Sequence, residues 1–209
     1  MSRFAFILAA AVSVFGADLN LTQVLRGIEN RYNRAQTLQV GFQEVYSGPG
    51  RPRRTESGTL YLRKPGRMRW EYASPKGKLF LIDGKFVYLY TPNSNRVEKM
   101  KVKESDDMRA PLAFLIGRLD FQKDFGRYEW RRDETGIRVR AFPKSDRLAY
   151  TLVEFTVDSD YRIRLLTVTG QDRSQLEFSF EGEQRNPALA PRLFQFEAPA
   201  GAEVLEVVG

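Results

Sequence analysis

The apolar positions of this sequence follow two different periods along the chain. Near the N-terminus they recur every three or four residues, at Leu21, Val24, Leu25, Ile28 and Tyr32, which predicts an amphipathic helix. Asn20 or Asp18 is its predicted N-cap. From residue 38 onward apolar and polar positions alternate, which is typical of β-strands. The predicted strands span 38–46, 58–63, 67–72, 78–83, 85–90, 95–103, 137–142, 150–158, 161–169, 174–180, 192–197 and 203–208.

The stretch LRKPGRMRWEY at 62–72 predicts a hairpin whose loop length determines its apolar face. If the loop is Pro65-Gly66, each face mixes apolar and charged side chains. If the loop also includes Arg67, one face is apolar throughout, carrying Leu60, Leu62, Met68, Trp70 and Tyr72. A slip of one residue moves every side chain to the opposite face, so we predict the second register. Lys64 then ends the apolar row and points inward.

The hairpin KLFLIDGKFVYLY at 78–90 turns at Asp83-Gly84, a strong signal for a tight turn. Its strands are apolar on both faces, which predicts that other parts of the molecule cover each face. Alternation leaves two choices for the inward set: Phe80, Ile82, Val87 and Leu89, or Leu79, Leu81, Phe86 and Tyr88.

The segment MRAPLAFLIGRL at 108–119 interrupts the alternation. Its apolar residues run together as in a short helix, with Pro111 tolerable only in the first turn. We therefore predict a sheet of roughly ten antiparallel strands, one N-terminal helix and one apolar insertion, with no linker that divides domains. Two helices are few for so large a sheet, so its apolar face either packs closely or encloses a cavity.

The first residues, MSRFAFILAAAVSVFGA, combine a cationic start at Arg3 with an apolar run from Phe4 to Phe15 and small residues after it. The run is too short to span a bilayer and fits the core of a secretory signal peptide. We predict cleavage after Gly16, so that 1–16 are removed and 17–209 form a single exported domain. A buried N-terminal helix is the alternative.

Composition limits the chemistry that the chain can perform. The sequence has no histidine and no cysteine, which excludes Ser-His and Cys-His dyads, thiolate zinc sites and disulfides. No glycine motif for phosphates or dinucleotides occurs. We therefore expect no catalysis, no metal and no cofactor.

The formal net charge of +7 raises the question of an anionic partner. The arginines mostly alternate along predicted strands, as Arg138 and Arg140 do, which is typical of a solvated sheet face. The dense run RPRR at 51–54 falls in a predicted Gly/Pro loop. An exported protein meets anionic lipid headgroups more readily than DNA. We expect no nucleic acid partner, and anionic lipid is the second interpretation after a plain basic surface.

Three stretches together resemble a known family: SGTLYLRKPGRMRWEY, the hairpin KLFLIDGK after it, and RAPLAFLIGR. They are similar to the outer-membrane lipoprotein carrier family (LolA-like) of Gram-negative bacteria, and the resemblance extends from RYNRAQTLQVGFQE to RLFQFEAPAGAEV. It implies an incomplete antiparallel β-barrel closed by the N-terminal helix and a short central helical lid. It also implies a periplasmic chaperone that shields lipoprotein acyl chains in a hydrophobic cavity and moves them from the inner to the outer membrane.

The same resemblance implies partners for the chain. An inner-membrane ABC-type lipoprotein release complex would load a monomeric carrier with acylated lipoproteins. An outer-membrane receptor, if present, would accept the cargo.

The resemblance also implies site residues. In that family an arginine just before the proline locks the lid; here Lys64 stands there beside Arg63, and an ammonium lacks the planar fork of a guanidinium. We expect Lys64 to bond lid carbonyls near Leu115 and Ile116, or Arg63 to substitute through a shifted register. Similarity to the family also favours the first inward set of the 78–90 hairpin. The expected wall and lid residues are Leu60, Leu62, Met68, Trp70, Phe80, Val87, Leu89, Leu21, Leu25, Phe114 and Leu115.

Two other functions remain open at this point. One is a carrier of other lipids or glycolipids on the same fold, which the bound ligand would distinguish. The other is a lipoprotein-sensing regulator of envelope stress, a type that usually has a second C-terminal domain after a linker. From this sequence we expect neither that linker nor that second domain.

Overall fold

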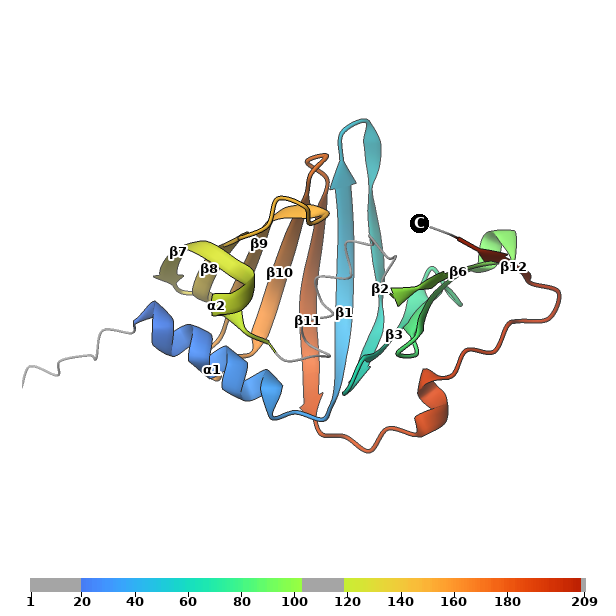
Figure 1. The fold of residues 1–209 in the computed structure, drawn as a ribbon, viewed down its shortest axis with the longest axis horizontal. Helices are drawn as coiled ribbons and strands as arrows, with labels where there is room; N and C mark the ends of the chain where they lie inside the picture. Colours follow the sequence, from blue (N-terminus) through green and yellow to red (C-terminus); the bar gives the residue numbers. More distant parts are fainter. Residues whose placement is uncertain (1–19, 103–118, 208–209) are drawn as a thin grey trace, which may run out of the picture.

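The computed structural model describes residues 20–102 and 119–207. These residues contain twelve strands: β1 (Thr37–Gly48), β2 (Arg51–Arg63), β3 (Arg67–Ser74), β4 (Leu79–Ile82), β5 (Phe86–Thr91), β6 (Arg96–Lys101), β7 (Phe125–Asp133), β8 (Gly136–Pro143), β9 (Tyr150–Val157), β10 (Ile163–Gly170), β11 (Gln175–Arg185) and β12 (Glu203–Glu206). They form one sheet in the order β12-β6-β5-β4-β3-β2-β1-β11-β10-β9-β8-β7. Figure 1 shows this sheet as an open, curved layer, which confirms the predicted fold class.

The N-terminal helix α1 (Leu21–Asn33) forms where the sequence predicts it. The side chain of Asn20 caps its start by accepting a hydrogen bond from the backbone N–H of Thr22 at 2.9 Å. Its buried residues are the predicted apolar stripe: Val24, Leu25, Ile28 and Tyr32. This stripe packs against the sheet, and we call the sheet face beneath it the concave face. Among the described residues, no helix is long and apolar enough to cross a membrane.

Outside the 62–72 hairpin, four predictions of local structure are wrong. Residues 51–54 belong to β2, because the turn after Gly48 joins β1 to β2 and the second strand already begins at Arg51. Strand β7 has no predicted counterpart, because it is an edge strand with polar residues at most positions. Residues 191–194 form the 3-10 helix η4 (Pro191–Phe194), which begins with a proline that cannot donate to a ladder. Strand β12 pairs with β6 in parallel, because a long connection carries the chain there from β11.

The short helix α2 (Phe121–Asp124) precedes β7 and buries Phe121. The predicted signal peptide at 1–16 lies outside the described residues. So does the predicted helix at 108–119, apart from Leu119.

The β2–β3 hairpin has the predicted apolar face, but its loop is Lys64-Pro65-Gly66 and not Pro65-Gly66-Arg67, because Arg67 begins β3 and pairs with Arg63. Leu60 lies opposite Trp70 and Leu62 opposite Met68, and all four side chains are buried. The same pairing brings Gly58 so close to β3 that a Cβ there would lie 1.9 Å from the backbone oxygen of Glu71. Only glycine fits at that position, so the register depends on one small residue as well as on the apolar pattern.

The β4–β5 hairpin is covered on both faces, as predicted. Phe80 lies opposite Leu89, and Ile82 lies opposite Val87; these four join the core on the concave face. On the other face Leu81 is also fully buried. The C-terminal segment covers that face: Phe196 stacks on Tyr88 with ring centroids 4.4 Å apart. In Figure 1 this segment passes β3 on its way to β12.

Candidate functional site

The concave face is an apolar surface to which both halves of the sheet contribute. Of the residues predicted for its wall, Leu60, Leu62, Met68, Trp70, Phe80 and Val87 are at most 3% exposed, and Leu89 is half-buried against them. Leu25 and Leu21 on α1 pack on the same core. The structure thus brings these predicted residues together. Phe114 and Leu115 lie outside the described residues.

Aromatic rings form the centre of this face. Phe42 packs edge-on against Trp70 with ring centroids 4.5 Å apart, and Trp70 lies 5.3 Å from Phe178. These rings come from β1, β3 and β11, so the centre joins the two halves of the sheet. Edge-on and tilted pairs are the favoured arrangements of aromatic rings.

The wall residues predicted on strands come only from the first half of the sheet. The second half adds a buried set of similar size: Ile137, Val139, Val153, Phe155, Val157, Leu166, Val168, Leu176 and Phe178. The alternation within 137–142 and 174–180 contains this signal. It could not be used without knowing which strands face α1.

Lys64 links the β2–β3 loop to the C-terminal end of α1. Its Nζ donates to the backbone oxygens of Tyr32 at 2.7 Å and Asn33 at 3.3 Å. Burial lowers the pKa of the Lys64 ammonium from its ordinary value. A cation at this helix end also interacts favourably with the helix dipole. The carbonyl partners that we predicted near Leu115 and Ile116 lie outside the described residues.

Arg63 lies on the opposite side of β2 from the apolar row. It pairs across the sheet with Thr37 on β1 and with Arg67 on β3. Its Nη1 is buried and has no hydrogen-bond partner among the described residues.

A second set of contacts holds α1 to the far half of the sheet. The Arg31 guanidinium pairs with Glu183 on β11, and its Nε lies 3.0 Å from Oε1. The Tyr32 hydroxyl donates to Oε2 of Glu183 at 2.9 Å and accepts from the backbone N–H of Ile163 at 2.9 Å. Burial, and then the Glu183 charge, raise the pKa of Tyr32 well above its ordinary value.

A buried polar cluster ends the apolar row on β1 and β2. Glu44 and Glu56 lie directly opposite each other, and both are buried. Tyr72 donates to Glu44 at 3.1 Å, and Glu56 pairs with Lys78 and, at 3.2 Å, with Arg54. This cluster was not predicted from the sequence. The signal was a pair of glutamates in phase with inward apolar positions.

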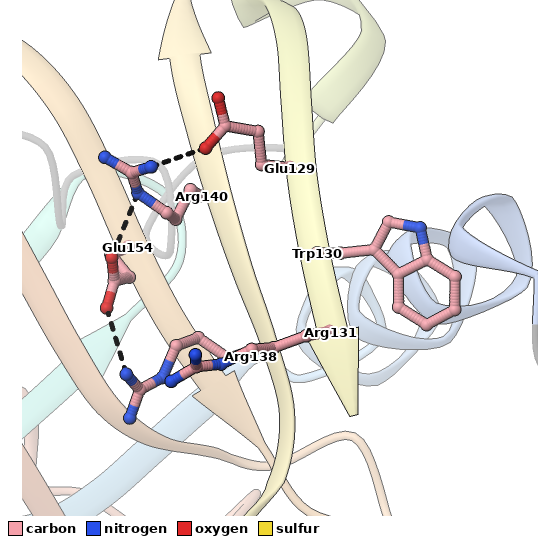
Figure 2. Close-up of a pocket in the computed structure, with 6 residues that line it drawn as sticks. All are labelled: Glu129, Trp130, Arg131, Arg138, Arg140 and Glu154. Carbon is pink, nitrogen blue, oxygen red and sulfur yellow. Dashed lines mark hydrogen bonds and ion pairs between the residues drawn. The ribbon is translucent and has the colours of Figure 1, made fainter. Parts of the chain in front are cut away.

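The outer face of β7, β8 and β9 carries a network of ion pairs around a hollow of about 400 Å³. Figure 2 shows Arg140 between Glu129 and Glu154, with Trp130 on the other side of β7. Arg140 Nε lies 3.3 Å from Glu154, and Arg138 Nη1 lies 3.8 Å from the same carboxylate. The alternating arginines of this strand are therefore paired with carboxylates on the outer face.

Comparison with known proteins gives one consistent family. Residues 33–197 match the profile of a family described as "Outer membrane lipoprotein carrier protein LolA". A protein of Xanthomonas campestris pv. campestris (strain B100), named outer-membrane lipoprotein carrier protein, is 30% identical over 207 residues, which cover 95% of this chain and 92% of that protein. One of the same name from Bordetella avium (strain 197N) is 30% identical over 178 residues, 83% of each chain.

Solved structures share the fold at lower identity. An uncharacterized conserved protein from Thermus thermophilus aligns with a TM-score of 0.53 and 14% identity, over 89% of this chain and 98% of that one. The crystal structure of MucB aligns with a TM-score of 0.50 and 12% identity, over 85% of this chain and 62% of that one. At these identities the likeness concerns the fold alone.

Proposed function

This chain belongs to the outer membrane lipoprotein carrier family LolA, and we propose that it is a periplasmic, monomeric carrier that shields lipoprotein acyl chains on its concave face. In this proposal the chain receives its cargo from an inner-membrane ABC-type release complex. It carries the cargo toward the outer membrane, where a receptor, if present, accepts it. The observation that supports the proposal is the continuous apolar surface beneath α1.

The energetics of acyl chains explain why such a surface is needed. Each methylene group transferred from water to an apolar site contributes about 0.8 kcal/mol. A chain of roughly fifteen methylenes therefore favours the apolar site by about 12 kcal/mol. A lipoprotein cannot cross an aqueous compartment at a useful concentration unless a protein covers its chains.

The same energetics require that α1, which covers the concave face, can move so that the acyl chains enter and leave. Val24 and Ile28 of α1 are fully buried against the concave face, so these side chains occupy space beside the wall. We propose that Lys64 holds the end of α1 as a reversible latch. A hydrogen bond contributes about 1 kcal/mol net, so the two bonds from Lys64 are weak compared with the transfer of one acyl chain. Arg63, on the other side of β2, has no such role in this proposal.

Native mass spectrometry on the chain purified from the periplasm without detergent tests the proposal. We expect a one-to-one adduct with an acylated lipoprotein. The matched control is the same lipoprotein produced without its acyl chains, which should not bind. A free phospholipid or glycolipid in place of the lipoprotein would contradict the proposed cargo and favour the carrier of other lipids. A chain that carries no lipid and also does not bind purified lipoprotein would contradict both the lipoprotein carrier and the carrier of other lipids.

A further inference from the structure

Five cationic residues lie at one end of the molecule, which we call the basic end: Arg34, Arg63, Arg67, Lys85 and Arg185. Arg34 follows α1, and the backbone oxygen of nearby Gln36 accepts the backbone N–H of Lys64. The Gln36 backbone N–H in turn donates to Asn186, next to Arg185. Figure 1 shows the end of α1, the start of β1 and the end of β11 at one edge of the molecule.

The two hairpin turns complete the basic end. Arg63 and Arg67 face each other across β2 and β3. The loop between them meets the β4–β5 turn, since a Cβ on Gly66 would lie 3.8 Å from the Cα of Gly84. Lys85 directly follows Gly84. Val102, which is 38% exposed, donates its backbone N–H to the Lys85 oxygen at 3.1 Å. The basic end therefore has an exposed apolar side chain beside its cations.

These five cations have no carboxylate partner among the described residues. Within residues 20–102 and 119–207, no ion pair joins any of them to an aspartate or glutamate. By contrast Arg127, Arg131, Arg138 and Arg140, on or beside the outer face shown in Figure 2, each pair with a carboxylate. Within the described residues other cations, such as Arg26, Arg53 and Arg164, also have no ion pair. The basic end differs in that five such cations lie at one end of the molecule and two of them are directly opposed.

The pairing of Arg63 with Arg67 is electrostatically unfavourable. Like charges directly opposite each other on neighbouring strands destabilise a sheet. Arg63 Nη1 is also buried without a hydrogen-bond partner in the described structure. A phosphate group near this pair would offset the repulsion between the two guanidinium groups, and guanidinium groups bind phosphate oxygens in a bidentate geometry.

We propose that the basic end docks on the surface of a phospholipid bilayer that contains anionic lipids. Its unpaired cations match the negative potential of such a surface. Its two opposed arginines match lipid phosphates, and the exposed Val102 can enter the headgroup region. Lys64 lies in the same loop, so docking places the Lys64–α1 contact next to the membrane. This inference extends the proposed function, but it does not depend on cargo.

Flotation of the cargo-free chain, from Ala17 onward, with lipid vesicles tests the inference. We expect binding to vesicles of equal parts phosphatidylglycerol and phosphatidylcholine, and none to pure phosphatidylcholine. Each cation near an anionic surface strengthens binding roughly fivefold at low salt. The double variant Arg67→Gln/Lys85→Gln should therefore bind about 25-fold more weakly. Raising the salt concentration should weaken binding of the unchanged chain as well.

The matched control is Arg96→Gln/Arg131→Gln. It removes the same charge at two exposed surface arginines that pair with Glu203 and Asp133. We expect it to keep most of the binding. Equal losses in the two variants, equal binding to both vesicle types, or no binding to either would each overturn the inference. Binding of an acidic protein without vesicle binding would overturn it too. None of these results bears on whether the chain takes up lipoprotein, so the two proposals can fail separately.

Discussion

Lys64 joins a strand loop to a helix through a single ammonium group. Its two acceptors, the backbone oxygens of Tyr32 and Asn33, belong to the last turn of α1, where carbonyl groups lack the usual i+4 partner, and the Tyr32 oxygen also accepts the Ala35 N–H. The ammonium satisfies these oxygens at the cost of partial burial, which is why its pKa is lowered. A favourable contact that is partly offset by burial suits the reversible latch of the proposed function.

Replacing Lys64 by alanine should loosen the end of α1. The loss of two charge-assisted hydrogen bonds at a partly exposed site should cost about 1–3 kcal/mol of unfolding free energy. Hydrogen exchange should show the effect directly, because the Ala35 amide bonded to the Tyr32 oxygen should exchange faster. The matched variant Lys64→Arg should protect the same amide at least as well, since its guanidinium can reach both oxygens. Unchanged exchange in Lys64→Ala would exclude Lys64 as a latch.

The helix α1 is held at its C-terminal end from two sides. Lys64 holds it to the β2–β3 loop, and Glu183 holds it to β10 and β11 through Arg31 and Tyr32. The Glu183 side chain is 6% exposed and that of Arg31 13%, so solvent screens this pair weakly. The contact to β11 is therefore expected to be the firmer of the two. If α1 moves when cargo enters, it should pivot on this side.

A double-mutant cycle can measure the firmer contact. Tyr32→Phe removes the hydroxyl that Glu183 and Ile163 share, and Glu183→Gln removes the charge. Groups in one hydrogen-bond network couple by about 0.5–3 kcal/mol, so the double variant should be destabilised by less than the sum of the single variants. The control cycle combines Tyr32→Phe with Glu154→Gln on the outer face and should be additive within about 0.5 kcal/mol. Additivity in both cycles would show that Glu183 does not hold Tyr32.

The open sheet as a whole has two edges that resist pairing with other chains. One edge is β7, which carries charged residues along most of its length, and the other is β12, which has only four residues. Short or charged edge strands are typical protection against edge-to-edge association. This arrangement supports the monomeric state in the proposed function. A carrier that aggregated through its edges could not deliver cargo.

Because the sequence has no histidine, the pH dependence of stability below neutral pH comes from the carboxylates. Hydrogen bonds from Thr135 and Ser174 lower the pKa values of Asp133 and Asp172, and Lys99 lowers that of Glu206. A carboxylate with a lowered folded-state pKa stabilises the fold above its unfolded pKa, and this contribution is lost as the pH falls through the folded value.

We therefore expect the free energy of unfolding to be constant between about pH 6 and 8 and to decrease below about pH 4. Urea denaturation at a series of pH values measures this. Asp133→Asn should change how steeply the free energy of unfolding decreases at acidic pH. Asp146→Asn, at an exposed turn, serves as the control. A transition near pH 6.5 would contradict the expectation, since about 6.5 is where an ordinary histidine titrates.

Much of the half-barrel could be predicted from local pattern. Leu60, Leu62, Met68 and Trp70 were placed on one face by parity alone, because only one register of that hairpin gives an apolar surface. The 78–90 hairpin was ambiguous, because Leu81 is as apolar as Phe80 and both are buried. Strand β7 was missed, because an edge strand with solvent on most sides needs no alternation. Residues 192–197 alternate like a strand but cover the outer face as a 3-10 helix and irregular chain.

The amino-acid sequence was sufficient for features that depend on near neighbours: strand period, the apolar stripe of α1, inward direction of Lys64 and overall charge. It was not sufficient for contacts between residues far apart in the chain. The bond from Lys64 to Tyr32 spans 32 positions, and the bond from Tyr32 to Glu183 spans 151. The gathering of Arg34, Arg63 and Arg185 at one end is of the same kind. Periodicity determines the face of a strand or helix on which a side chain lies. Its contact partner depends on which distant segment the tertiary structure places beside that face.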